Sequence, residues 1–174
     1  MSRLTVMIVA VVVLAVGCTR GEAVNEPTMT QAQALARVEQ LIKETSDVIK
    51  PNPHLDLYRP SLNVNSCLDP TDGGSEDRVV ISRSYYLRDI PKDQVGEVAR
   101  QVKQHWERQG YYIETVSQDG LAVFGHSQPD DFLLSIGPTG DDDVLNLGVT
   151  SPCVWPNGTP EPSPGETSSE LPEP

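Results

Sequence analysis

The longest apolar run of the chain lies close to its start. Residues 4–16 are almost all aliphatic, and Arg3 precedes them. As a helix this run of 13 residues is about 20 Å long, which is short of the ~30 Å needed to cross a bilayer core. Its length and its flanks are typical of a secretory signal sequence. We therefore predict that residues 1–17 form a signal peptide.

Two later segments have apolar residues at intervals of three and four positions, which predicts two amphipathic helices. The first covers about residues 29–49, with Thr28 and Gln31 at the spacing of a capping box. The second follows Pro91 and ends at Gly110, a residue suited to a left-handed helix cap. Its apolar face consists of Val95, Val98, Ala99, Val102 and Trp106.

The remaining apolar segments alternate or are rich in β-branched residues, as strands are. They are residues 62–66, 78–87, 111–116, 121–124, 132–136 and 144–149. The Asp119-Gly120 pair indicates a hairpin, and short links between the later strands favour an antiparallel meander. We predict an α+β two-layer sandwich, in which two helices cover one face of a mainly antiparallel sheet of five or six strands.

The polar segments divide the rest of the chain. Residues 18–27 are short and polar and suit a tether, and residues 28–155 form the predicted domain. Residues 156–174 are rich in Pro, Ser, Thr and Glu, which predicts a disordered tail. The net charge of −12 argues against nucleic acid as a partner and against electrostatic binding to anionic lipid. Removal of residues 1–17 would leave 12 basic against 25 acidic residues, a charge of −13.

The segment Leu14-Ala15-Val16-Gly17-Cys18 resembles the lipobox of bacterial lipoproteins. It departs from that pattern in having Ala15 where leucine is preferred, with Leu14 one position earlier. The resemblance implies diacylglycerol on Cys18, cleavage just before it, and a membrane anchor on the extracytoplasmic side. Two acyl chains hold a protein on a bilayer stably. The alternatives are an ordinary cleaved signal with an incidental cysteine, or an uncleaved anchor helix.

The chain has three cysteines, and lipid on Cys18 leaves Cys67 and Cys153. Export would place both in an oxidising compartment, so we predict a disulfide between them. The two lie 86 positions apart, and closing such a loop stabilises a fold by about 4–5 kcal/mol in the chain-entropy treatment. A zinc site is the alternative, but the chain has no CxxC and no histidine pair at ligand spacing. No cofactor or metal is predicted.

Candidate catalytic residues are sparse. Of the histidines, His54 falls in the link after the first helix, and His105 is expected at the solvent or at the sheet edge. His126 is followed by Ser127, with Asp130 and Asp131 close by, a set that could form a Ser–His–Asp triad. The GxSxG elbow of many hydrolases is missing from the sequence. We therefore predict that the protein is not an enzyme and keep a hydrolase as a minor alternative.

Two acidic loops could supply oxygen ligands to calcium. Their carboxylates are Asp69, Asp72, Glu76 and Asp77 in one loop and Asp141, Asp142 and Asp143 in the other. The first loop does not have the ligand spacing of an EF-hand. Solvated turns are the favoured interpretation, and calcium binding is the alternative.

Two pairs of adjacent tyrosines fall in predicted strands, Tyr85-Tyr86 and Tyr111-Tyr112. Neighbouring strand residues point to opposite faces of a sheet, so one tyrosine of each pair should pack under the helices. The outward members, Tyr86 and Tyr112, are a candidate interaction patch, because tyrosine is enriched at protein interfaces. An ordinary half-exposed sheet face is the simpler interpretation.

The chain resembles the small secreted lipoproteins of actinobacteria, including the LppA-like lipoproteins of mycobacteria. The shared marks are the lipobox at Cys18, Trp106 with Gly110-Tyr111 after it, and the segment 151–156 around Cys153. The resemblance implies a cell-membrane location and an α+β fold, and it carries over no catalytic residue. We expect a non-enzymatic module that binds another component of the envelope. The alternative is a carrier that binds calcium, or a small ligand in a pocket between helices and sheet.

Overall fold

The computed structural model describes residues 26–67, 74–140 and 144–160. Cys18, the signal segment 1–17, most of the predicted tether and residues 161–174 lie outside this part of the chain, so those assignments stay predictions. The elements in chain order are α1 (Gln31–Asp47), β1 (His54–Leu57), the 3-10 helix η2 (Arg59–Leu62), β2 (Val64–Ser66), β3 (Val79–Arg88), the 3-10 helix η3 (Lys92–Gln94), α2 (Val95–Arg108), β4 (Tyr112–Val116), β5 (Val123–His126), β6 (Leu133–Thr139) and β7 (Val144–Thr150).

The strands form one antiparallel sheet in the order β1-β3-β7-β6-β5-β4, with β2 also paired to β3. The predicted meander is β4-β5-β6-β7, and α2 carries the chain from β3 across to β4. The seven strands exceed the expected five or six because β1 was not predicted. Its four residues follow Pro53 closely and are at most half-buried, so they lack a strong apolar pattern. His54 begins this strand, where we had expected a loop.

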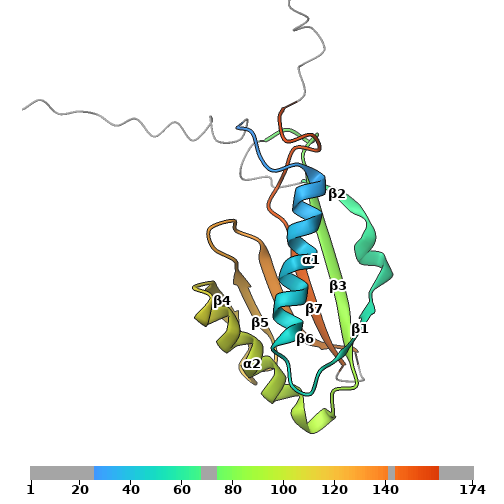
Figure 1. Cartoon of the computed structure of the whole chain (residues 1–174), viewed down its shortest axis with the longest axis vertical. Coiled ribbons are helices and arrows are strands. Elements are labelled where there is room, and N and C mark those ends of the chain that lie inside the picture. The colour runs from blue at the N-terminus through green and yellow to red at the C-terminus, as the bar shows by residue number, and fades with distance from the viewer. Residues whose placement is uncertain (1–25, 68–73, 141–143, 161–174) are drawn as a thin grey trace, which may run out of the picture.

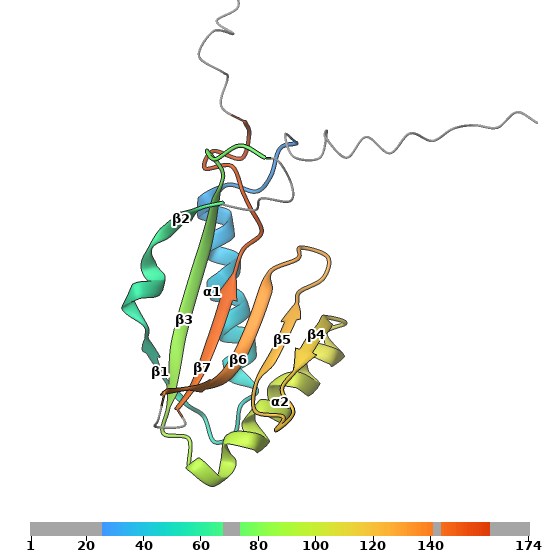
Figure 2. The same cartoon turned by 180° about the vertical axis from the view of Figure 1, so that it is seen from behind.

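Both helices cover the same face of the sheet, α1 over β3 and β7 and α2 over the β4–β6 side (Figure 1). The opposite face is left bare in Figure 2. This confirms the α+β two-layer prediction. Most of the largest fully buried side chains come from the two helices and from the strand positions that face them, and Phe132 comes from the residue just before β6. They include Trp106, Phe132, Leu41, Ile42, Leu87, Leu134, Ile136, Leu145 and Leu147.

The helices are joined through Trp106, whose indole Nε1 donates a hydrogen bond to Thr45 Oγ1 at 3.0 Å in the buried core. Gly110 (φ 76°) ends α2 as predicted. The amide of Gly110 bonds to Glu107 O, and the amide of Tyr111 bonds to Trp106 O. This is the Schellman pattern, in which a left-handed glycine lets the chain turn back over the last carbonyls.

The predicted capping box of α1 was wrong by two residues. Thr30 is the N-cap, because its hydroxyl accepts from Gln33 N at 3.2 Å and Gln33 Oε1 accepts from Thr30 N at 2.8 Å. The same Thr-x-x-Gln spacing occurs at Thr28 and Gln31, so spacing alone could not choose between them. Thr28 has a tertiary partner instead, since its Oγ1 accepts a hydrogen bond from Trp155 N at 2.8 Å.

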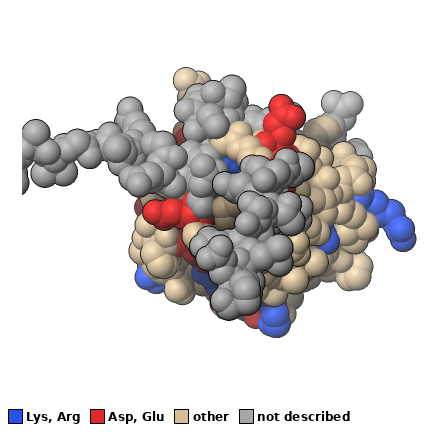
Figure 3. Space-filling view, turned by 90° about the horizontal axis from the view of Figure 1, so that it is seen from above, with Lys and Arg blue, Asp and Glu red and all other residues tan. Residues whose placement is uncertain are grey.

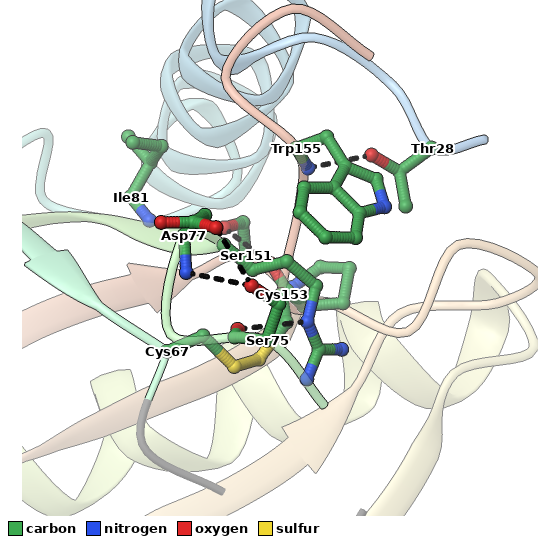
Figure 4. Close-up of a disulfide and its surroundings, with 10 residues drawn as sticks. Thr28, Cys67, Ser75, Asp77, Ile81, Ser151, Cys153 and Trp155 are labelled. Atoms are coloured by element: carbon green, nitrogen blue, oxygen red, sulfur yellow. Dashed lines mark hydrogen bonds between the residues drawn. A yellow bond between two sulfur atoms is a disulfide. The ribbon is translucent and has the colours of Figure 1, made fainter. Parts of the chain in front are cut away.

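The two described ends of the chain meet at one end of the domain, which we call the terminal pole. Cys67 follows β2 and Cys153 follows β7, and the two are disulfide-bonded with their Cα atoms 5.6 Å apart (Figure 4). The amide of Thr28 donates to Gly158 O at 2.9 Å. Residues 156–158 are therefore part of the fold, although the disordered tail was predicted to begin at 156. No helix in the described ranges is long and apolar enough to cross a membrane.

A candidate binding surface on the open face of the sheet

The tyrosine pairs divide between the two faces as predicted. Tyr85 and Tyr111 pack against the core under the helices. Tyr86 and Tyr112 point to the open face, on β3 and β4. Strands β7, β6 and β5 lie between β3 and β4, so four interstrand steps of ~4.8 Å separate the two strands by about 19 Å across the sheet. They belong to two different clusters.

Tyr86 is engaged by its own neighbours. The Tyr58 ring lies against it in a T-shaped arrangement, with centroids 5.6 Å apart. The Arg88 guanidinium lies 4.8 Å from the centroid of the Tyr86 ring, and Arg88 Nη2 is 2.9 Å from Asp56 Oδ2. The Tyr86 ring therefore has an aromatic neighbour and a cation–π partner, and the ion pair with Asp56 holds that partner in place. A partner would have to displace these contacts in order to reach the ring.

Tyr112 lies in an exposed apolar cluster. The strand register places it opposite His126, and His126 opposite Leu133. Phe124 lies two residues before His126 on β5 and shares its face. The exposed fractions are 59% for Tyr112, 40% for Phe124 and 37% for Leu133. We call Tyr112, Phe124, His126 and Leu133 the outer patch.

Two carboxylates border the outer patch. Asp131 Oδ1 lies 2.9 Å from His126 Nδ1, and Glu114 Oε2 lies 3.6 Å from His126 Nε2. Glu114 lies in an irregularity of β4 between Ile113 and Thr115, where the register with β5 shifts. A bulge of this kind turns a side chain toward a neighbour that regular alternation would not give it. The side chains of Glu114 and Asp131 are 52% and 68% exposed.

Short polar residues separate the two clusters. Ser82 and Thr150 share a hydrogen bond between their hydroxyls at 2.9 Å, and Ser84 Oγ donates to Asn146 Oδ1 at 2.5 Å. A Cβ atom on Gly148 would lie 2.7 Å from Ser135 Oγ, so the middle of the face is closely packed at the level of the backbone. The aromatic side chains of the outer patch consequently project beyond the short polar side chains beside them.

The structure divides the Ser–His–Asp set into two separate pairs: His126 lies against Asp131, whereas Ser127 bonds to Asp130. Ser127 is fully buried, and its hydroxyl donates to Asp130 Oδ1 at 2.5 Å and accepts from Phe132 N at 3.0 Å. Asp130 Oδ2 in turn accepts from Arg37 Nε at 2.6 Å. Burial tends to raise the pKa of Asp130, but the hydrogen bonds from Arg37 and Ser127 outweigh it and lower the pKa. These contacts hold the β5–β6 loop against α1.

His105 is buried, although we expected it at the surface or at the sheet edge. Desolvation by burial lowers the pKa of His105, and the charge of Arg108 lowers it further against the opposing effect of Glu44. The neutral imidazole is therefore the form that the folded protein favours.

The space between helices and sheet, where a carrier would hold its ligand, is filled by core side chains that are 0–2% exposed. A surface hollow with a volume of about 370 Å³ lies near the start of α1, beside Leu35, Val64 and Ile81. Within the described ranges, no three His, Cys, Asp or Glu side chains converge as metal ligands. Asp69, Asp72 and Asp141–Asp143 fall outside those ranges.

Comparisons with protein-family models, curated proteins and solved structures find no match to this chain. Phe124, Leu133 and Glu114 were not singled out from the sequence. Alternation along β5 and β6 could have indicated that Phe124 and Leu133 point outward, but only the pairing of β4, β5 and β6 places them beside Tyr112.

Proposed function

We propose that this protein is a lipid-anchored, extracytoplasmic lipoprotein of the cell envelope, and that its domain binds another envelope component without catalysing a reaction. The observation that carries the proposal is the exposure of Tyr112, Phe124 and Leu133 side by side on the sheet face opposite α1 and α2. A contiguous exposed apolar patch is a mark of interaction sites on soluble domains.

The anchor is supported by the apolar run of residues 4–16 and by the small residues before Cys18. The Cys67–Cys153 disulfide is consistent with this location, because structural disulfides persist in oxidising compartments. The eight residue-to-residue steps from Cys18 to Glu26 span at most about 28 Å, so an anchored domain would stand with its terminal pole close to the bilayer.

In this orientation the strands would run away from the membrane and leave the open face accessible from the side. Viewed onto the terminal pole, the lysine and arginine side chains that the grey atoms leave visible stand apart from one another (Figure 3). Attachment would accordingly depend on the acyl chains, since adsorption to anionic lipid requires clustered basic residues.

The anchor is tested with a Cys18→Ala variant of the full chain in a bacterial host that processes lipoproteins. We expect the wild type to fractionate with membranes and to carry the mass of its acyl chains, and the variant to lose both properties. Membrane association of the variant, together with an unmodified mass for the native protein, would contradict the anchor.

Binding through the open face is tested by photo-crosslinking in intact cells, with benzoylphenylalanine in place of Tyr112. The control carries it at Tyr58, an aromatic residue that is 40% exposed and lies beside Tyr86. We expect adducts of defined mass at position 112 and few at position 58. Equal labelling at the two positions, or no adduct at 112, would overturn the binding role of the outer patch.

A further inference from the structure

We propose that the outer patch binds a basic, apolar segment of a partner protein, in which large apolar side chains alternate with lysine or arginine. This inference rests on the proposed binding function and specifies the chemistry of the partner. It follows from the composition of the patch and of its border.

The centre of the patch calls for apolar side chains. Tyr112 and Phe124 present rings, Leu133 presents a branched chain, and the three lie on adjacent strands within one surface. Burial of such groups contributes about 25 cal/mol per Å² of apolar area. Aromatic residues are also the most frequent anchors of protein interfaces.

The border of the outer patch favours a partner with positive charge. The groups that face His126 are Glu114 from β4, Asp131 from the β5–β6 loop and the Tyr112 ring. The neighbouring positions on β6, β7 and β3 are the uncharged Ser135, Thr150 and Ser82. Two exposed carboxylates therefore give the patch a negative border, which a cationic segment complements.

The same charges disfavour other occupants. Anionic phospholipids and anionic polymers would meet Glu114 and Asp131 as well as a chain of net charge −12. A second copy that docked patch to patch would bring two further carboxylates against the first two. Like charges at an interface suppress such pairings.

The test uses the mature full-length lipoprotein in lipid nanodiscs and three synthetic peptides. In each peptide Phe and Leu alternate with one polar residue, which is Lys, Gln or Glu. We expect the Lys peptide to bind at least about ten times more tightly than the Glu peptide, with the Gln peptide between them. Raising the salt concentration should weaken the Lys peptide selectively.

Two kinds of variant locate the binding. Tyr112→Ser combined with Phe124→Ser should weaken the Lys peptide about tenfold or more, whereas Tyr58→Ser should leave it unchanged. The double variant E114Q/D131N should reduce the preference for Lys over Gln. Its control, D47N/E107Q, removes the same charge from the helix layer and should preserve that preference. Circular dichroism on each variant checks that the fold is retained.

Equal affinity for the Lys and Gln peptides would overturn the proposal, as would binding that the patch variants do not change. Loss of vesicle binding or of self-association in the Tyr112→Ser/Phe124→Ser variant would also overturn it, in favour of a lipid surface or a second copy. If these peptide experiments fail while crosslinks at position 112 persist in cells, the binding function stands and only the basic partner is rejected.

Discussion

The two faces of the sheet are built from alternate residues of the same strands, but they are stabilised by different interactions. On β6, Leu134 and Ile136 point to the helices and are 0–1% exposed, whereas Leu133 and Ser135 point to the open face. The inner face is held by the volume of apolar side chains, and the outer face by hydroxyl and amide hydrogen bonds. Stability should therefore depend on the inner residues, and recognition on the outer ones.

The sharpest comparison is between two adjacent residues of β6. Ile136→Ala removes a side chain that is 1% exposed and should lower the free energy of unfolding by about 2–5 kcal/mol. Ser135→Ala removes one half-buried hydroxyl and should change it by about 1 kcal/mol or less. Urea denaturation of both variants measures the difference. A similar loss of unfolding free energy in both variants would show that the open face contributes as much to stability as the core.

The next largest effect on stability should come from the loop that connects β5 and β6. Ser127→Ala removes the donor to Asp130 and the acceptor for Phe132 N. We expect a loss of about 1–3 kcal/mol, because it leaves buried polar groups without a partner. Asp130→Asn should also destabilise, through the loss of its ion pair with Arg37. Because the pKa of Asp130 is lowered by folding, its contribution should disappear as the pH falls below about 4.

The two tyrosine clusters offer a comparison within the open face. Tyr86→Ser breaks contacts with Tyr58 and Arg88 and should cost about 1 kcal/mol. Tyr112→Ser exchanges a side chain that is 59% exposed and should cost less than about 0.5 kcal/mol. Thermal unfolding of the pair checks this. If Tyr112→Ser proved the more destabilising variant, the outer patch would be structural.

The smallest effect concerns His105 in the helix layer. Its pKa is lowered in the folded state by burial and by Arg108, so the unfolded chain binds the proton more readily. The contribution of His105 to the free energy of unfolding should therefore be fully present above its unfolded pKa of about 6.5. It should decline as the pH falls from there toward the folded pKa. The His105→Gln variant should show a flatter dependence of stability on pH, and the His54→Gln control should keep the dependence of the wild type. An unchanged slope in the position 105 variant would assign the dependence to other groups.

The elements that could be predicted are those whose signal is local. The apolar periodicity of α1 and α2, the left-handed glycine after α2, and the Asp119-Gly120 turn each act within a few residues. The disulfide followed from counting cysteines, since only one pair remained once Cys18 was assigned to lipid. By contrast, β1 escaped prediction, because four half-exposed residues become a strand only through pairing with β3.

The sequence by itself determined the helices, most of the strands, the two-layer class and the outward direction of Tyr86 and Tyr112, because backbone geometry sets these periodicities locally. Tertiary structure alone decided that Tyr86 is enclosed by Tyr58 and Arg88, and that Tyr112 shares an acidic-bordered patch with Phe124 and Leu133. It also placed Ser127 in the core and His126 on the open face. Strand order and register decide which residues become neighbours. They arise from pairing between distant segments, which the local sequence of a single segment does not determine.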